Sequence, residues 1–188
     1  MASDALIFLL RAVCEFFACV LFLRFWMQVC RVAGRNPLAT FVQALTNPVV
    51  LPARRVIPGV WGLDTATLLV AWLTLVIEIT LILLLKGALA DFGTAIASIL
   101  LLALTLLLRL TIYLAIAAIF LQVILSWVNP GSPLAPVVSA LTRPLLRPIQ
   151  RVVPTIGMVD LSPLIALLML QLVLMVPLAY LERMVGGF

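Results

Sequence analysis

Four long apolar runs divide the chain, and two stretches rich in proline and arginine separate them in pairs. The first run begins near the N-terminus, and the others extend from Thr65 to Leu85, from Phe92 to Val128 and from Leu161 to Leu181. A helix that crosses the hydrocarbon core of a bilayer needs about 17–25 residues. Each run is long enough, so the pattern predicts an all-α membrane protein, a four-helix transmembrane bundle. The third run exceeds one span, so it is either one long helix or two pieces broken near Arg109.

The first run resembles a signal peptide only in its position. Met1 to Asp4 lack the positive charge that begins a secretory signal, and Arg11, Glu15 and Arg24 precede any small-residue cleavage site. We therefore expect this segment to be retained as a membrane helix.

An internal repeat relates the two halves of the chain. Pro37-Leu38-Ala39 recurs 96 positions later at residues 133–135, and residues 44–48 recur at 140–144 with one substitution. Upstream the offset becomes 98, which aligns Arg11 with Arg109 and favours one long third helix with an N-terminal extension. Such ungapped matches indicate a duplication. We infer two tandem hairpins of the same orientation, at residues 1–90 and 91–188, whose interfacial loops cover residues 31–63 and 129–160.

Composition excludes a soluble domain and most site chemistry. Hydrophobic residues make up 65% of the chain and charged residues 10%, whereas soluble domains average about 45–50% and 25%. Histidine is absent, and the three cysteines show no CxxC spacing. We expect no enzyme activity, no cofactor, no metal site and no nucleic-acid partner.

The arginines predict the orientation in the membrane. Both loops between paired runs are basic, with no acid before Asp64 or Asp160. The other side is nearly balanced in charge, with Asp4, Lys86, Asp91, Glu182 and Arg183. By the positive-inside rule both loops are expected in the cytoplasm and both termini outside. The loop arginines are Arg31, Arg35, Arg54 and Arg55 in the first loop and Arg143, Arg147 and Arg151 in the second.

Two interpretations of these loops remain open. The arginines either anchor the loops among anionic lipid headgroups, or they form a docking surface for a partner protein or a specific anionic lipid. The candidate docking residues are Arg54, Arg55, Arg143, Arg147 and Arg151. We expect no long regular helix in either loop, because prolines recur along them, at 48, 52 and 58 in the first loop and at 144, 148 and 154 in the second. A homo-oligomer is also left open.

Each second helix begins at an aspartate, Asp64 or Asp160. An acid at this place caps free backbone N–H groups. The alternative is a latch that pairs these aspartates with Arg55 and Arg151, and both roles can coexist.

Four charged residues fall inside the apolar runs, namely Arg11, Glu15, Glu78 and Arg109. A charge at mid-bilayer is costly, so these side chains should be paired. We expect a structural ion-pair network that holds the repeats together, with a direct Glu15–Arg109 pair. The alternative is a conduction or proton pathway.

The duplicated loop sequence resembles the signature of the YggT family. It contains Asn36-Pro37, Thr46-Asn47-Pro48 and Arg54-Arg55 in the first copy, and Ser132-Pro133 and Thr142-Arg143-Pro144 in the second. Gln150 replaces the first of the two arginines, and residues 65–67 lack the Ser-Pro that Ser162-Pro163 retains. The resemblance implies a small integral protein of bacterial inner membranes and plastids. It also implies links to cell-division gene neighbourhoods, osmotic-stress tolerance and plastid cytochrome assembly, and it supplies no catalytic residue.

From these observations we expect a non-enzymatic scaffold or assembly factor for inner-membrane machinery, which acts through its cytoplasmic loops. The alternative is an ion or osmolyte pathway used under osmotic stress. Anionic membrane lipids and a membrane or cytoplasmic protein of unknown identity are the expected partners.

Overall fold

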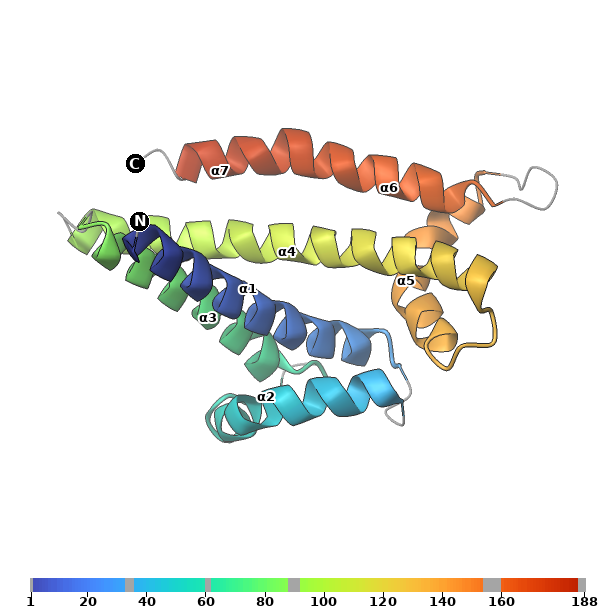
Figure 1. Ribbon diagram of the computed structural model, residues 1–188, viewed down its shortest axis with the longest axis horizontal. Helices are drawn as coiled ribbons and strands as arrows, with labels where there is room; N and C mark the ends of the chain where they lie inside the picture. The colour runs from blue at the N-terminus through green and yellow to red at the C-terminus, as the bar shows by residue number, and fades with distance from the viewer. Residues whose placement is uncertain (1, 33–35, 60–61, 88–91, 154–159, 186–188) are drawn as a thin grey trace.

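A computed structural model describes residues 2–32, 36–59, 62–87, 92–153 and 160–185, with helices throughout these ranges (Figure 1). Three helices form the first half and the remaining five helical segments form the second. The α-helices are α1 (Ala2–Val29), α2 (Pro37–Val56), α3 (Thr65–Leu85), α4 (Phe92–Val128), α5 (Ala135–Gln150), α6 (Ser162–Val173) and α7 (Ala179–Val185), with a π-helix, η1 (Leu174–Leu178), between the last two.

The chain is an all-α multi-pass membrane protein, as the apolar runs predict. Four helical segments are long and apolar enough to cross a bilayer, at Ser3–Val29, Thr65–Leu85, Ile96–Val128 and Ser162–Met184. The third contains no break near Arg109, because α4 continues as one α-helix of 37 residues. At a rise of about 1.5 Å per residue it is about 56 Å long, which leaves room for two packing partners along its length.

Small residues bring α1, α3 and the N-terminal half of α4 together. Ala18, Ala71 and Ala103 are fully buried at this junction, and Leu21 and Leu75 fill the space beside them. Small side chains let membrane helices approach closely, which increases their van der Waals contact. The indole N–H of Trp72 also donates to the carbonyl of Leu100 at 3.3 Å, so that α3 and α4 are joined by a polar contact as well.

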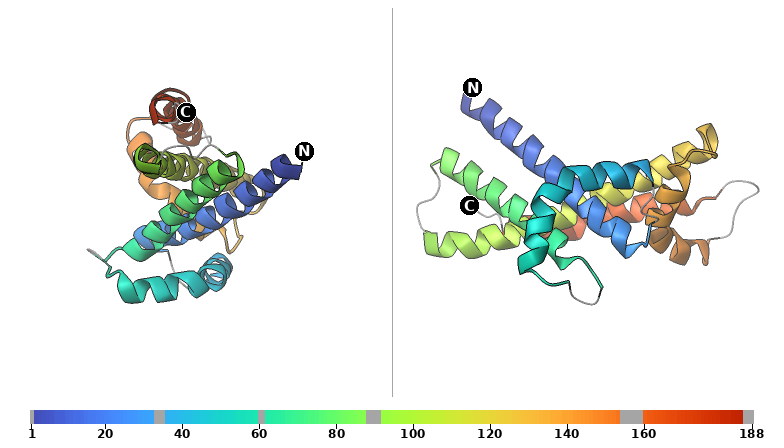
Figure 2. Two further views of the ribbon diagram at one scale, coloured as in Figure 1. Left: turned by 90° about the vertical axis from the view of Figure 1, so that its left-hand side faces the viewer. Right: turned by 90° about the horizontal axis from the view of Figure 1, so that it is seen from below.

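The C-terminal half of α4 packs on the second pair of elements. Ile119, Leu146 and Ala166 form a buried cluster that joins α4, α5 and α6. α6, η1 and α7 run beside α4 on the side away from α1 (Figures 1 and 2). The C-terminal half of α4 therefore packs on α5 and α6, whereas its N-terminal half lies between α1 and α3 on one side and α7 on the other.

A third buried cluster joins the halves near the end of α1. It contains Met27 of α1, Ala39 of α2, and Val137 and Leu141 of α5. In Figure 1 the start of α1 and the end of α7 lie at one end of the bundle, and α5 lies at the other. The helices α2 and α5, which follow α1 and α4, thus both contribute residues to this cluster.

The expectation that prolines prevent long helices in the loops is wrong. α2 is 20 residues long with Pro48 and Pro52 inside it, and α5 contains Pro144 and Pro148. All four prolines lie on exposed faces, where the carbonyls that lose their N–H partner can reach water or headgroups. Internal proline bends a helix rather than ending it in such a setting, and α2 changes direction along its length (Figure 2).

A membrane-spanning segment, a proline-containing helix and a second membrane-spanning segment follow one another twice in the described residues. We call the proline-containing helices α2 and α5 the short helices, because neither is long and apolar enough to cross a bilayer. The inferred boundary between residues 90 and 91 lies outside them, as do residues 33–35, 60–61 and 154–159 of the two loops. The duplication itself stays an inference from the sequence.

Candidate functional site

The short helices α2 and α5 bury matching positions. Val42, Thr46 and Val50 of α2 are buried, and so are Val138, Thr142 and Leu146 of α5, each 96 positions later. This spacing of four residues places one stripe of each helix against the transmembrane helices. The opposite face of each short helix is consequently left exposed.

Each stripe contains a buried threonine that binds a polar side chain of the preceding long helix. Arg24 Nη1 of α1 donates to Thr46 Oγ1 at 2.6 Å and to Asn47 Oδ1 at 2.9 Å. In the second half, Thr142 is hydrogen-bonded to Gln122 of α4. Because Arg24 and Gln122 are 98 positions apart, both contacts follow the offsets of the sequence repeat.

A charged contact joins the end of α2 to the start of α3. Arg54 Nε lies 3.2 Å and 3.1 Å from the two carboxylate oxygens of Asp64, and Arg54 Nη2 also forms an ion pair with Asp64. The structure therefore pairs Asp64 with Arg54 and not with Arg55, the partner proposed from the sequence. One residue along a helix rotates a side chain by about 100°, which turns Arg55 to the exposed side.

Asp64 also caps α3. Its side chain accepts a hydrogen bond from the backbone N–H of Thr67 at 3.3 Å and another from the Thr67 hydroxyl. Burial raises the pKa of the Asp64 carboxyl, but the hydrogen bonds from Arg54 and Thr67 outweigh burial, so the pKa lies below its usual value. Capping and pairing thus operate together at this residue.

Asp160 makes the corresponding contacts with neutral partners. Gln150 Nε2 donates to Asp160 Oδ2 at 2.9 Å, and the backbone N–H of Ser162 donates to Asp160 Oδ1 at 2.8 Å. Arg151, proposed as the partner of Asp160, is exposed and makes no such contact. The second half therefore has a glutamine–aspartate contact where the first half has an ion pair.

Four of the five candidate docking arginines remain available to a partner. Arg55, Arg143, Arg147 and Arg151 are exposed, and none forms a hydrogen bond or ion pair with another residue that the structure describes. Arg54, the fifth, is engaged by Asp64. We call the exposed arginines of α5 and its end, namely Arg143, Arg147 and Arg151, the basic surface.

Inside the membrane, Arg11 is paired with Glu78. Arg11 Nε lies 3.7 Å from Glu78 Oε1, and the Glu78 side chain is only 2% exposed, whereas that of Arg11 is 55% exposed. The second carboxylate oxygen of Glu78 has no hydrogen-bond partner among the described residues. This ion pair links α1 to α3 within the first half.

The expected Glu15–Arg109 pair is wrong. Arg109 Nη1 instead binds Glu182 of α7, at 3.2 Å from Oε1 and 3.3 Å from Oε2, and the guanidinium lies 5.8 Å from the centre of the Tyr113 ring. Glu15 forms no hydrogen bond or ion pair with the described residues. Sequence reasoning placed Glu182 outside the membrane and missed it.

A signal for Glu182 exists in the sequence. Arg109 lies 19 residues before the end of α4, and Glu182 lies 20 residues after the start of α6. In two antiparallel helices with aligned ends, both side chains therefore lie about 29–30 Å from the same end. Counting from the helix ends therefore accounts for the pair once the alignment of the two helices is known.

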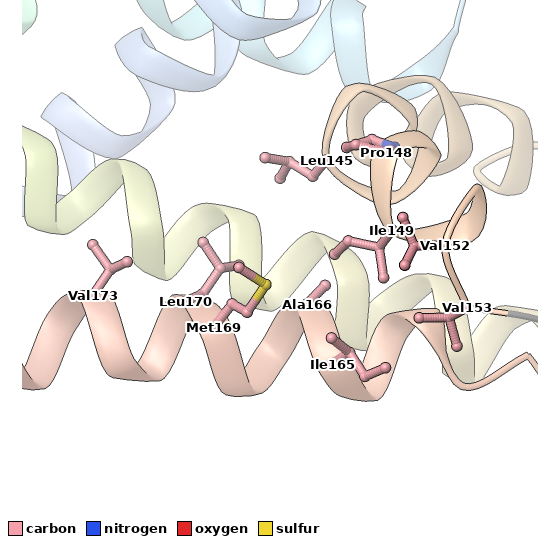
Figure 3. A pocket seen from close by; sticks show the side chains of 10 residues that line it. All are labelled: Leu145, Pro148, Ile149, Val152, Val153, Ile165, Ala166, Met169, Leu170 and Val173. Atoms are coloured by element: carbon pink, nitrogen blue, oxygen red, sulfur yellow. The ribbon is translucent and has the colours of Figure 1, made fainter.

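The described cavities offer little for catalysis. A cavity of about 520 Å³ between α5 and α6 is lined only by apolar residues, including Leu145, Ile149 and Met169 (Figure 3). Another of about 690 Å³ between α4 and α6 contains Arg109, Tyr113 and Gln171. The described part of the chain holds no group of three His, Cys, Asp or Glu residues suited to a metal ion.

Comparison with known proteins identifies similar chains in several bacteria. The CCB3/YggT family profile matches residues 3–85 and 101–181. The uncharacterized protein YggT of Escherichia coli K12 is 38% identical over 171 residues, which cover 90% of this chain and 87% of that protein. An uncharacterized protein encoded in the proC 3′ region of Vibrio alginolyticus is 35% identical over 89% of this chain and 90% of its own length. No solved structure shows a significant match.

Proposed function

The chain belongs to the CCB3/YggT family, and from this premise we propose that it is a non-enzymatic scaffold or assembly factor of the bacterial inner membrane. In this proposal α5 presents the basic surface to an acidic segment of a partner protein. The observation that carries the proposal is that Arg143, Arg147 and Arg151 are exposed and have no acidic partner among the described residues.

The packing of α5 supports a role in docking. Its buried stripe fixes it to α4 and α6 through Leu146, and to α1 and α2 through Val137 and Leu141. A helix packed against α4 and α6 presents its arginines in a fixed arrangement, which lowers the entropy lost when a partner binds. Guanidinium groups suit such a surface because they bind carboxylates through two parallel hydrogen bonds.

The proposed orientation places the basic surface in the cytoplasm. Both short helices carry exposed arginines, and both follow a membrane-spanning helix, whereas the ends of α3 and α7 carry the nearly balanced charges of Lys86, Glu182 and Arg183. The positive-inside rule then assigns α2 and α5 to the cytoplasmic side.

Site-specific photo-crosslinking tests the proposal. A photo-reactive amino acid at Ser139, an exposed position of α5, should give discrete protein adducts in intact cells. Replacing Arg143, Arg147 and Arg151 by Gln should remove these adducts without lowering the amount of protein in the membrane. Arg183→Gln serves as the control at the other end of the bundle and should keep them. Adducts that persist after the triple replacement would refute docking through the basic surface.

A second candidate, an ion or osmolyte pathway, is favoured by one observation. The cavity between α4 and α6 brings Arg109 and Gln171 together at membrane depth beside the π-helix η1, and π-helical turns are frequent at functional sites. Against a pathway, Arg109 is bound to Glu182, and the junction of α1, α3 and α4 is filled by apolar side chains. Flux through liposomes containing the purified protein, lost on Gln171→Leu, would favour the pathway over the scaffold.

A further inference from the structure

A polar cavity lies between α1 and α2, apart from the basic surface. Its volume is about 430 Å³, and it is lined by two arginines, Arg24 and Arg54, together with the amides of Gln28, Gln43 and Asn47. Met27, Val42 and Leu51 complete the wall with apolar side chains. A cavity with both cationic and apolar walls suits an amphipathic anion.

The two arginines retain unused hydrogen-bond donors. A guanidinium has five N–H groups, and Arg24 uses Nη1 for Thr46 and Asn47. Arg54 uses Nε and Nη2 for Asp64. Nε and Nη2 of Arg24 and Nη1 of Arg54 have no partner among the described residues. Both guanidinium groups are therefore held by oxygen atoms on one side and remain able to donate on the other.

The charges at this cavity do not balance within the described residues. Arg24 and Arg54 contribute two positive charges, and Asp64, which is bound to Arg54, contributes one negative charge. The two guanidinium groups repel one another across the cavity. A bound anion would remove this repulsion and use the free donors through paired N–H···O bonds, which are the strong form of arginine recognition.

The depth of the cavity selects the kind of anion. Arg24 lies five residues before the end of α1 at Val29, or about 8 Å along the helix. The headgroup region of each leaflet extends about 5–8 Å beyond the hydrocarbon core. With Val29 at the outer edge of the headgroup region, the backbone of Arg24 lies near the boundary between headgroups and hydrocarbon, from which its long side chain can reach a lipid phosphate.

We propose that this cavity between α1 and α2 binds the phosphate group of an anionic phospholipid, held by Arg24 and Arg54. The amides of Gln28 and Gln43 bind polar headgroup atoms, and Leu51 contacts the lipid chain. This site is independent of the protein partner proposed above, because none of the residues of the basic surface lines the cavity.

Lipid-dependent thermal stability of the full chain tests the site. The delipidated protein is titrated in detergent with phosphatidylglycerol and, separately, with phosphatidylcholine, since a ligand that binds only the folded state raises the melting temperature. Phosphatidylglycerol should raise the melting temperature of the parent, and phosphatidylcholine should raise it less. Equal effects of the two lipids would overturn the proposal.

A matched pair of variants tests whether phosphatidylglycerol binds in this cavity. Gln43→Glu places a negative charge in the cavity, and the Gln43 side chain makes no hydrogen bond within the described residues, so this change removes no internal contact. It should weaken phosphatidylglycerol binding about fivefold. Ser139→Glu adds the same charge at the exposed position 96 residues later on α5 and should leave lipid binding unchanged. Equal weakening in both variants would mean a general charge effect and would overturn the site.

Two further measurements identify the source of the bound phosphate and test the role of Arg24. Inorganic phosphate at the same molar concentration should compete weakly with the lipid. If it binds as tightly as phosphatidylglycerol, the ligand is a soluble anion and the lipid assignment fails. Arg24→Lys keeps one charge but loses the planar pair of donors, so it should also reduce binding, whereas unchanged binding would exclude Arg24 from the site.

Discussion

Replacing Arg54 by Gln should destabilise the protein by breaking the contact between the end of α2 and the start of α3. Arg54 binds both oxygens of Asp64, and the Asp64 side chain is only 5% exposed. Removing the arginine leaves a buried carboxylate that is bound mainly by Thr67. The second half already shows what a glutamine can do, since Gln150 gives Asp160 one neutral hydrogen bond.

The size of the stability loss expected for Arg54→Gln follows from the geometry of the contact. Losing one partner of a fully buried ion pair costs about 3–5 kcal/mol, but the Arg54 side chain is 42% exposed, so solvent screens part of the attraction. A glutamine at this position also recovers one hydrogen bond. We therefore expect a loss of about 2 kcal/mol, the usual value for a hydrogen bond to a charged group. This loss corresponds to a decrease of about 4–8 °C in the melting temperature of a chain of this size.

The reciprocal change, Gln150→Arg, is the matched control. It places an arginine opposite Asp160, but Asp160 is exposed, and exposed ion pairs contribute about 0.2–1 kcal/mol. A small gain is expected, well below the loss at Arg54. The two changes together test whether burial of the aspartate, and not the arginine alone, determines how much the arginine–aspartate contact stabilises the protein.

The pH dependence supplies an independent check. The pKa of Asp64 lies below its usual value because the bonds from Arg54 and Thr67 outweigh burial. A lowered pKa contributes stability that is present above the unfolded pKa of about 3.9 and lost as the pH falls through the folded value. The difference between parent and Arg54→Gln should hold from pH 7 to about 5 and shrink below about 4.

Thermal unfolding in detergent, followed by circular dichroism at several pH values, measures these differences. If Arg54→Gln unfolds at the same temperature as the parent at pH 7, the contact has no structural role. A loss of the expected size that does not change down to pH 3 would assign it to packing of the Arg54 side chain and not to its charge.

Three further predictions follow from other contacts. A double-mutant cycle with Arg109→Gln and Glu182→Gln should show a coupling of about 1–2 kcal/mol in thermal stability, larger than the coupling between Arg109→Gln and Glu15→Gln; the reverse order would refute the pairing in the structure. In a cysteine-free background, single cysteines at Val56 and Ser139 should resist an impermeant thiol reagent added to intact cells, and one at Lys86 should react; opposite labelling would invert the proposed orientation. Thr46→Val should lower stability by about 1–3 kcal/mol, because it removes an acceptor of the part-buried Arg24, and stability equal to that of the parent would show that water replaces this contact.

The transmembrane helices could be predicted from the sequence because their limits are marked by charge and polarity. α3 coincides with the apolar run between Asp64 and Lys86, and α4 coincides with the run from Phe92 to Val128. These limits depend on the cost of placing polar groups in hydrocarbon, which acts on each residue locally. No knowledge of packing is needed to find them.

The short helices and the ion-pair partners depend on packing and were missed. Pro48 and Pro144 argued against helices, and only the exposed position of these residues in α2 and α5 explains why the helices persist. The choice of Arg54 over Arg55 depends on which side of α2 faces α3. The pairing of Arg109 with Glu182 requires the alignment of α4 with α7, which the apolar pattern does not specify.

Comparative purification from native membranes tests most directly whether the basic surface recruits a protein. The parent and the variant with Arg143, Arg147 and Arg151 replaced by Gln are extracted in native lipid particles at equal abundance, and the accompanying proteins are quantified. The scaffold proposal predicts that a small set of membrane or cytoplasmic proteins accompanies the parent and is depleted from the variant, while Arg183→Gln retains the whole set. The same proteins in equal amounts with all three chains would contradict it.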